Sequence, residues 1–351
     1  MCGIIGYIGE KPVVPVLIDG LRRLEYRGYD SAGVALVRNG DIEVRRSAGK
    51  LARLEETIAE HPVDGDYGLG HTRWATHGRP TEENAHPHRD CTGRIVVVHN
   101  GIIENYLQLK LELEQQGHRF KTETDTEIIA HLVEREMRDD GLEHAVRRAL
   151  TLVRGLFGMV LLAADDPHKL VAVRNGPPIV VGMGDHEFLV ASDVSPVLSH
   201  TRDVVFLGDE QMAIITPDGV AFTDFAGAPV ETMTQRVTWD PVMAEKAGYK
   251  HFMLKEIFEQ PRALEDTLRG RLDRQNGTIR GAEIGLSPED AKSIDRVVLL
   301  ACGTSHHAAM TGRYFIETLA RVPTVVELAS EFRGRGAVIG ERDMVIGVSQ
   351  S

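Results

Sequence analysis

The sequence predicts two domains of different fold class, an α+β domain followed by the first part of an α/β domain with a parallel sheet. Short strand-like runs separated by Gly, Pro, Asp and Asn fill residues 156–230, which is typical of an antiparallel sheet. The run 297–301 is entirely apolar, as expected of a parallel strand covered on both faces. We place the first domain at residues 2–220, an interdomain linker region at 221–287 and an incomplete second domain at 288–351, and 351 residues are enough for both.

The chain opens with a predicted buried strand that carries a cysteine at position 2, Met1-Cys2-Gly3-Ile4-Ile5-Gly6-Tyr7. If Met1 is removed, Cys2 has a thiol with a pKa of about 8.5 and a free α-amine with a pKa of about 7.7–8.0. The amine can then accept the thiol proton, so that Cys2 acts as a nucleophile without a separate histidine. A small buried core residue is the alternative, and the heptapeptide alone does not decide between the two.

Apolar residues at helical spacing predict a helix over residues 13–24. A glycine-punctuated turn follows, which contains Arg27 and leads to a strand at residues 34–37. A helix followed by such a turn is common scaffolding, so the local sequence favours a structural or surface role for Arg27.

Residues 69–80 are predicted to form a strand end and a loop with two His, two Thr, two Arg and one of the chain's two Trp. The planar guanidinium of Arg73 suits a carboxylate ligand. Five histidines lie between His71 and His99, both included. Their spacing fits neither H-E-x-x-H nor a Cys/His zinc pattern, so we expect no metal there.

The buried strand that begins at residue 95 is predicted to end at Asn100-Gly101. This dipeptide is typical of a tight hairpin turn, and the local sequence favours that interpretation. The functional alternative is an oxyanion hole, in which the Asn100 amide and the Gly101 N–H donate to a developing negative oxygen.

Two helices are expected next, one over residues 107–116 and one that starts near residues 122–127. Thr124 and Glu127 have the spacing of a capping box for the second helix. Asp125 is either a plain helix-start residue or a partner for a substrate ammonium.

The second domain is predicted to place small hydroxyl residues between strands and helices. Residues 302–305 form a loop that opens a helix over 306–320, and further strands follow at 325–328 and 345–348. A strand, a hydroxyl-rich loop and a helix N-terminus together suit a phosphate. Because the chain stops inside the next such loop, we expect it to be truncated at its C-terminus.

Composition narrows the class of protein. A formal net charge of −12 argues against nucleic acid or an anionic membrane as the main partner. The three cysteines, Cys2, Cys91 and Cys302, are too few for a disulfide framework. Without a long apolar run or a signal-peptide pattern, the sequence indicates a soluble cytoplasmic protein.

Five motifs in order resemble the class II (N-terminal-nucleophile) glutamine amidotransferases. They are Cys2-Gly3-Ile4, Tyr26-Arg27-Gly28-Tyr29-Asp30-Ser31, His71-Thr72-Arg73-Trp74-Ala75-Thr76-His77-Gly78, His99-Asn100-Gly101 and Glu123-Thr124-Asp125-Thr126-Glu127. The later motifs Ala301-Cys302-Gly303-Thr304-Ser305 and Ser349-Gln350-Ser351 resemble the opening of a sugar-isomerase (SIS) domain. The resemblance implies an αββα glutaminase fold followed by the first part of a flavodoxin-like parallel sheet.

The resemblance also implies a role for each candidate residue. Cys2 attacks the glutamine side-chain amide, with Asn100 and Gly101 at the oxyanion. Arg73 binds the α-carboxylate of glutamine and Asp125 its α-ammonium. The remaining candidates are Thr76 and His77 in the pocket wall, Arg27 as support for the terminus, Trp74 as a gate for ammonia, and Cys302, Gly303, Thr304, Ser305, Ser349, Gln350 and Ser351 at the sugar phosphate.

The pairing of the two domains implies transfer of ammonia from L-glutamine to fructose 6-phosphate, through a thioester, to give glucosamine 6-phosphate for hexosamine biosynthesis. No cofactor is implied, and a homodimer is expected for the full-length protein. Because the second half of the SIS domain is absent, we expect the chain as given to act only as a glutaminase. Two alternatives stay open: an amidotransferase with another acceptor, such as a phosphoribosyl or aspartyl substrate, and a regulatory module that binds a sugar phosphate.

Overall fold

The computed structural model describes residues 2–28, 30–74, 79–238, 249, 251–268, 272–273, 278–279 and 286–349. The chain divides into two compact units, Met1–Ala247 and Gly248–Ser351. Strands β13 (Gly219–Asp224) and β14 (Gln235–Arg236) belong to the sheets of the first unit, so this unit extends beyond residue 220.

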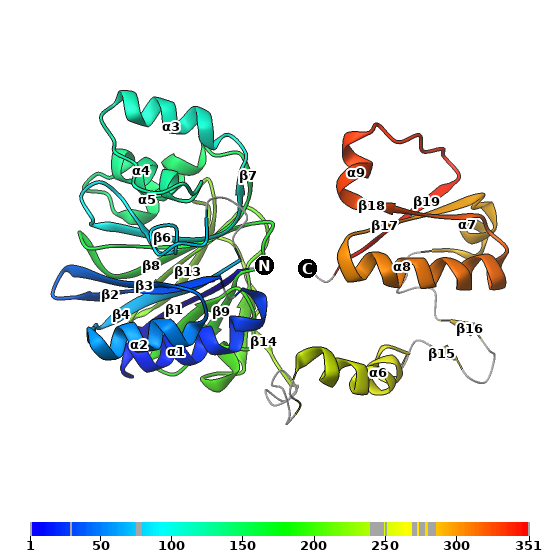
Figure 1. Ribbon diagram of the computed structural model, residues 1–351, viewed down its shortest axis with the longest axis horizontal. Helices are drawn as coiled ribbons and strands as arrows, with labels where there is room; N and C mark the ends of the chain where they lie inside the picture. Colours follow the sequence, from blue (N-terminus) through cyan, green and yellow to red (C-terminus); the bar gives the residue numbers. More distant parts are fainter. Residues whose placement is uncertain are drawn as a thin grey trace. The chain divides into compact units, whose positions relative to one another are not determined.

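Two stacked sheets form the centre of the first unit (Figure 1). In spatial order the eight-stranded sheet contains β14, β11 (Asp203–Phe206), β9 (Val180–Met183), β10 (Glu187–Ala191), β1 (Gly3–Gly9), β4 (Tyr67–Arg73), β2 (Ser31–Arg38) and β3 (Asp41–Ala48). The six-stranded sheet contains β13, β12 (Gln211–Thr216), β8 (Asp166–Asn175), β7 (Gly155–Ala163), β6 (Ile95–Ile103) and β5 (His88–Arg89). All pairings in both sheets are antiparallel, which confirms the prediction made for the strands of residues 156–230.

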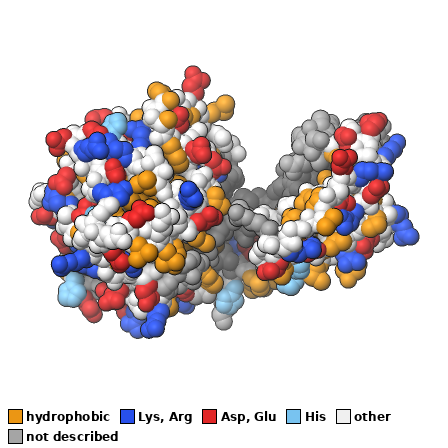
Figure 2. All heavy atoms as spheres, turned by 90° about the horizontal axis from the view of Figure 1, so that it is seen from above, with side chains coloured by type: hydrophobic (Ala, Val, Ile, Leu, Met, Phe, Trp, Pro, Cys, Tyr) orange, Lys and Arg blue, Asp and Glu red, His pale blue; other side chains and the backbone are white. Residues whose placement is uncertain are grey.

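Helices cover the outer face of each sheet. Helices α1 (Val13–Leu24) and α2 (Leu51–Glu60) pack on the eight-stranded sheet, and α3 (Tyr106–Gln115), α4 (Glu127–Glu136) and α5 (Leu142–Leu150) pack on the six-stranded one (Figure 1). Three separate clusters of buried apolar residues fill the α–β, β–β and β–α interfaces. The αββα architecture is therefore confirmed. Acidic and basic side chains are interspersed over the face of this unit that Figure 2 shows.

Several local predictions are confirmed and two are wrong. Helix α1 has the predicted bounds, and β1 is a buried strand. Asn100-Gly101 does not form a hairpin turn, because β6 continues to Ile103 in register with β7. Helix α4 has Thr126 at its N-cap without a side-chain cap, so the capping box of Thr124 with Glu127 is also wrong.

The capping box does not form because the side chains of Thr124 and Glu127 have partners in the preceding turn rather than at the helix start. The Glu127 carboxylate accepts the backbone N–H groups of Lys121 and Thr122 at 2.8 and 2.7 Å. The Thr124 hydroxyl lies 3.1 Å from His88 Nε2 and 3.0 Å from the Thr122 hydroxyl.

The second unit contains a parallel sheet with the order β18 (Thr324–Leu328), β17 (Arg296–Ala301), β19 (Asp343–Val348). Its helices include α6 (Phe252–Leu268), α7 (Pro288–Ser293), α8 (Gly303–Phe315), which runs into a π-helical turn at Ile316–Ala320, and α9 (Ala329–Gly334). A short pair, β15 (Leu272–Asp273) and β16 (Thr278–Ile279), lies between α6 and α7 in the chain. The parallel sheet is as predicted, but α8 begins at Gly303, so Gly303, Thr304 and Ser305 form its first turn and not a separate loop.

Among the helices that the structure describes, none has the length and apolar character needed to cross a membrane.

Candidate active site

Strand β1 fixes the position of Cys2. It lies between β10 and β4, and the N–H of Ile4 donates to the hydroxyl of Ser192 at 2.9 Å. The N–H of Ser192 in turn donates to the carbonyl of Ile4 at 3.0 Å. A Cβ at Gly3 would lie 2.6 Å from Leu24 Cβ and from Thr72 Oγ1. The chain beside Cys2 is thus packed too closely for any side chain at position 3, which places Cys2 at the end of a rigid central strand.

The sulfur of Cys2 accepts a backbone hydrogen bond. The N–H of Trp74 donates to Cys2 Sγ at 3.2 Å, and Sγ lies 3.6 Å from the carbonyl oxygen of Trp74. A donor to sulfur stabilises the thiolate over the thiol. The Trp74 side chain is 45% exposed.

The Asn100 amide points at Cys2 from β6. Its Nδ2 donates to the carbonyl of Cys2 at 3.1 Å, and its Oδ1 lies 3.0 Å from His71 Nε2. His71 is buried, and burial lowers its pKa to about 3, so the ring is neutral at ordinary pH. Because Nε2 faces two carbonyl oxygens, Asn100 Oδ1 and His99 O, it carries the ring proton and donates it. That donation fixes which end of the Asn100 amide faces the cysteine.

Gly101 has a backbone conformation that suits glycine. Its φ is +125°, and a Cβ there would overlap the carbonyl oxygen of Leu156 on β7. The Asn-Gly pair is therefore part of the strand, with glycine required by the close approach of β7.

Two opposite charges line the pocket that contains Cys2. Arg73 is 3% exposed, and its pKa is lowered by burial while nearby Cys2 and Asp125 oppose that shift. Asp125 is 6% exposed and accepts the N–H of Ile103 at 2.8 Å. The pocket is lined by Cys2, Arg73, Trp74, His86, His99, Gly101, Thr124, Asp125 and Thr126.

A group of buried histidines forms the support behind this pocket. The rings of His71 and His86 stack with centroids 4.1 Å apart, and His86 meets His88 edge-on at 4.5 Å. Burial lowers the pKa of all four described members, His71, His86, His88 and His99. His86 Nε2 and His99 Nδ1 each lie 2.9 Å from the hydroxyl of Thr126. Neutral imidazoles thus connect the segment that carries Asp125 to the two strands that carry Arg73 and Asn100.

The local sequence did not predict the residues that position Arg73. Its Nη1 donates to the carbonyl of Arg79 at 3.2 Å, and the N–H of Arg79 donates to the Glu123 carboxylate at 3.1 Å. Asn84 Nδ2 also donates to Glu123, at 3.0 Å, and these two donors lower the pKa of Glu123. Spacing in the sequence gives no signal for this network, nor for His71 as the partner of Asn100.

Several candidate residues lie outside the described part of the chain. These are Thr76, His77, Gln350 and Ser351, together with the side chain of Arg27. The described candidates Cys2, Arg73, Trp74, Gly101 and Asp125 line one pocket, with Asn100 hydrogen-bonded to Cys2.

The second group of candidates lies at the carboxyl ends of two paired strands. Ala301 of β17 is in register with Val348 of β19, so Cys302 and Ser349 follow directly at the same sheet edge. Cys302 is the N-cap residue of α8, and Gly303 has a φ of +57°. Gly303, Thr304 and Ser305 supply the first turn of α8, whose free N–H groups suit an anion.

Comparison with known proteins agrees with both parts of the fold. Residues 71–199 match the model of a glutamine amidotransferase domain, and residues 292–351 match that of the SIS domain. Glutamine–fructose-6-phosphate aminotransferases (isomerizing) of Symbiobacterium thermophilum and Thermus thermophilus are each 50% identical over all 351 residues. This chain spans 58% and 57% of their lengths.

A solved structure shares the fold at lower sequence identity. The glutamine phosphoribosylpyrophosphate amidotransferase of B. subtilis superimposes with a TM-score of 0.56 at 20% identity, covering 96% of this chain and 71% of that one.

Proposed function

We propose that this chain, which is homologous over its whole length to the glutamine–fructose-6-phosphate aminotransferases, hydrolyses glutamine at Cys2 and supplies the ammonia to a sugar phosphate. The observation that carries the proposal is one pocket that contains a strand-end thiol, a buried cation and a buried carboxylate. A free amino acid has a complementary set of groups, because its α-carboxylate suits Arg73 and its α-ammonium suits Asp125.

The proposed first step forms a thioester. With Met1 removed, the α-amine of Cys2 takes the thiol proton, and Sγ attacks the side-chain amide carbon of glutamine. Negative charge develops on the amide oxygen, where the Asn100 amide and the Gly101 N–H donate. The C–N bond then breaks as the nitrogen takes the proton and leaves as ammonia. Water attacks the thioester, releases glutamate and returns the proton to sulfur or amine.

Two features of the pocket favour this chemistry. The N–H of Trp74, 3.2 Å from Sγ, can donate to the thiolate that forms before attack. The Asn100 amide needs no reorientation to serve as a donor, because His71 already holds its Oδ1 at 3.0 Å. We assign Trp74, half-exposed beside the sulfur, as the side chain that gates the departure of ammonia, and Thr76, His77 and Arg27 keep the supporting roles expected from the resemblance.

The acceptor proposed for the second unit is fructose 6-phosphate. A phosphate at the N-terminus of α8 would face backbone N–H groups and the hydroxyls of Thr304 and Ser305, with Ser349 from the neighbouring strand. The names of the full-length relatives support this acceptor over a phosphoribosyl one. In the complete protein, ammonia and fructose 6-phosphate would yield glucosamine 6-phosphate.

The test uses the 351-residue chain and measures glutamate, ammonia and amino-sugar phosphate separately. We expect glutamate release by the wild type and none above background for Cys2→Ala, which removes little volume. Brief incubation with glutamine followed by acid quenching should leave a glutamyl adduct on the N-terminal peptide, detected by mass spectrometry. The peptides that contain Cys91 and Cys302 serve as internal controls. Wild-type turnover by Cys2→Ala, or an adduct on another cysteine, would refute the assignment.

A further inference from the structure

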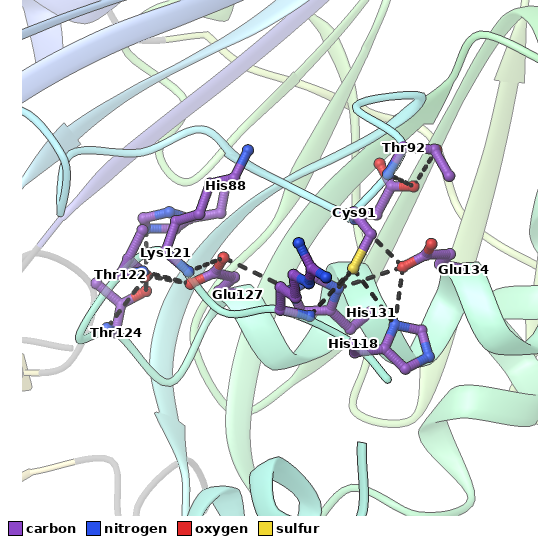
Figure 3. Close-up of polar contacts among 12 residues, drawn as sticks. His88, Cys91, Thr92, His118, Lys121, Thr122, Thr124, Glu127, His131 and Glu134 are labelled. Carbon is purple, nitrogen blue, oxygen red and sulfur yellow. Dashed lines mark hydrogen bonds and ion pairs between the residues drawn. The ribbon is translucent and has the colours of Figure 1, made fainter. Parts of the chain in front are cut away.

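Four side chains on the first unit converge on one point outside the glutamine pocket. Cys91 follows β5, His118 lies between α3 and α4, and His131 and Glu134 are one turn apart on α4 (Figure 3). Their ligand atoms, Sγ, Nδ1 and carboxylate oxygen, all lie within 4.8 Å of one another. We propose that these four residues bind a zinc ion.

The distances between the ligand atoms fit a tetrahedral zinc site. Zinc bonds of about 2.3 Å to sulfur and about 2.0–2.1 Å to nitrogen or oxygen, at tetrahedral angles, place neighbouring ligand atoms about 3.3–3.6 Å apart. Cys91 Sγ lies 3.5 Å from His131 Nδ1 and 3.7 Å from His118 Nδ1. Glu134 Oε2 lies 3.3 Å from His131 Nδ1 and 3.0 Å from His118 Nδ1. A thiolate and a carboxylate with two neutral imidazoles also balance the charge of a divalent ion.

Hydrogen bonds among these four side chains cannot account for all of their close contacts. Each Nδ1 faces both the sulfur of Cys91 and the carboxylate of Glu134, yet a ring nitrogen has one N–H or one lone pair in one direction. A cation between the four atoms uses the single direction of each ring. It also leaves the N–H of Arg119, at 3.3 Å, as a donor to the sulfur, and the N–H of Cys91, at 3.2 Å, as a donor to Glu134.

The second ring nitrogen of His131 supports the same interpretation. His131 is buried, and its Nε2 lacks a hydrogen-bond partner but lies 3.5 Å from the Glu127 carboxylate. If Nδ1 binds zinc, Nε2 carries the proton and faces a carboxylate, which is the usual outer partner of a zinc-bound histidine. If Nδ1 instead carried the only proton, the Nε2 lone pair would face that negative group.

Zinc at this site would join three segments. It would tie the β5–β6 connection and the segment after α3 to α4, whose start follows Asp125 and Thr126 of the glutamine pocket. A groove of about 790 Å³ that passes Cys91 and Thr92 offers a route for the ion. Four protein ligands make the site structural rather than catalytic, since none of the four positions stays open for water.

Metal content and cobalt spectroscopy test the proposal independently of glutamine turnover. The full chain is purified in metal-depleted buffer and supplied with zinc. Its bound zinc is then measured by elemental mass spectrometry. We expect about one zinc per chain, and cobalt in its place should give a sulfur-to-cobalt charge-transfer band. Cys91→Ser and His118→Gln should each lower zinc affinity at least tenfold, because even an outer partner of a ligand contributes about 10- to 100-fold.

Matched substitutions of exposed residues serve as controls. Cys302→Ser and His61→Gln lie outside the cluster and should leave zinc content and the charge-transfer band unchanged. A wild-type chain that takes up neither zinc nor cobalt would show that the four residues form a hydrogen-bonded network only. Equal zinc loss in Cys302→Ser and Cys91→Ser would overturn the site as well.

Discussion

Replacing Asn100 by alanine separates catalysis from folding at this pocket. The truncation removes the Nδ2 donor that lies 3.1 Å from the Cys2 carbonyl. Loss of one oxyanion donor lowers kcat by about 10²–10³, which corresponds to about 2.7–4 kcal/mol of transition-state stabilisation. We therefore expect Asn100→Ala to lower kcat for glutamine hydrolysis by that factor, with KM nearly unchanged.

The structure limits the effect of the same change on stability. His71 Nε2 loses the Asn100 oxygen but keeps the carbonyl of His99 at 3.1 Å, so no buried donor is left without an acceptor. The free energy of unfolding should then fall by about 1–3 kcal/mol, the net contribution of the two hydrogen bonds that the Asn100 side chain makes. Thermal melting would show a folded protein under the assay conditions.

The assay is steady-state glutamate release over a range of glutamine concentrations, with thermal melting of the same samples. Asn175→Ala is the matched control, because Asn175 Nδ2 donates to the Gly155 carbonyl and the residue does not line the glutamine pocket. It should lose less stability, because its truncation removes the hydrogen bond to Gly155, and it should keep its kcat. A kcat within threefold of wild type for folded Asn100→Ala would refute the oxyanion role.

Three further predictions follow from the same pocket. Arg73→Ala should raise KM for glutamine about 10- to 100-fold and change kcat less, because its partner carboxylate keeps its charge during the reaction; a pure kcat loss in steady-state kinetics would contradict this. Gly101→Ala should lower the free energy of unfolding by about 1–3 kcal/mol or more in denaturant titration, because φ is +125° and the new Cβ meets β7; unchanged stability would contradict the strand geometry. Burial lowers the pKa of His71 and His88 to about 3 from 6.5, so the unfolded chain binds more protons in that range, and stability should be full above pH 6.5 and fall as pH drops toward about 3. The slope of melting temperature against pH should be smaller in His88→Gln, and an equal slope would show that other groups control acid stability.

Local patterns predicted the elements whose partners lie within the same segment. The apolar spacing of α1 and the apolar run 297–301 of β17 reflect burial that each sequence encodes by itself. Asn100-Gly101 was ambiguous because the dipeptide also suits a hairpin, and only pairing with β7, a segment far along the chain, keeps it inside a strand. At such positions, contact with a distant segment decides whether the residues form a turn or a strand.

The candidate site was predictable as a set of chemical types but not as a network. Cys2, Arg73 and Asp125 stand out because thiol, guanidinium and carboxylate each suit one part of glutamine. The partner of Asn100, buried His71, gave no local signal, since a histidine on a strand has many uses. Cys91 and His118 are equally silent in sequence, because the fold alone brings them to α4.

The order of the three parallel strands has its own consequence for the second unit. Helix α8 connects β17 to β18, which lies on one side of β17 in the sheet. Helix α9 then connects β18 to β19, which lies on the other side of β17. Right-handed crossovers in opposite directions require the two helices to lie on opposite faces, as Figure 1 shows for α8 and α9. The connection from the carboxyl end of β17 therefore leaves on the face of α8, and the connection from β18 leaves on the face of α9. Cys302 and Ser349 follow the adjacent strands β17 and β19 at one edge of the sheet, so the strand order alone brings these two distant segments together at the N-terminus of α8.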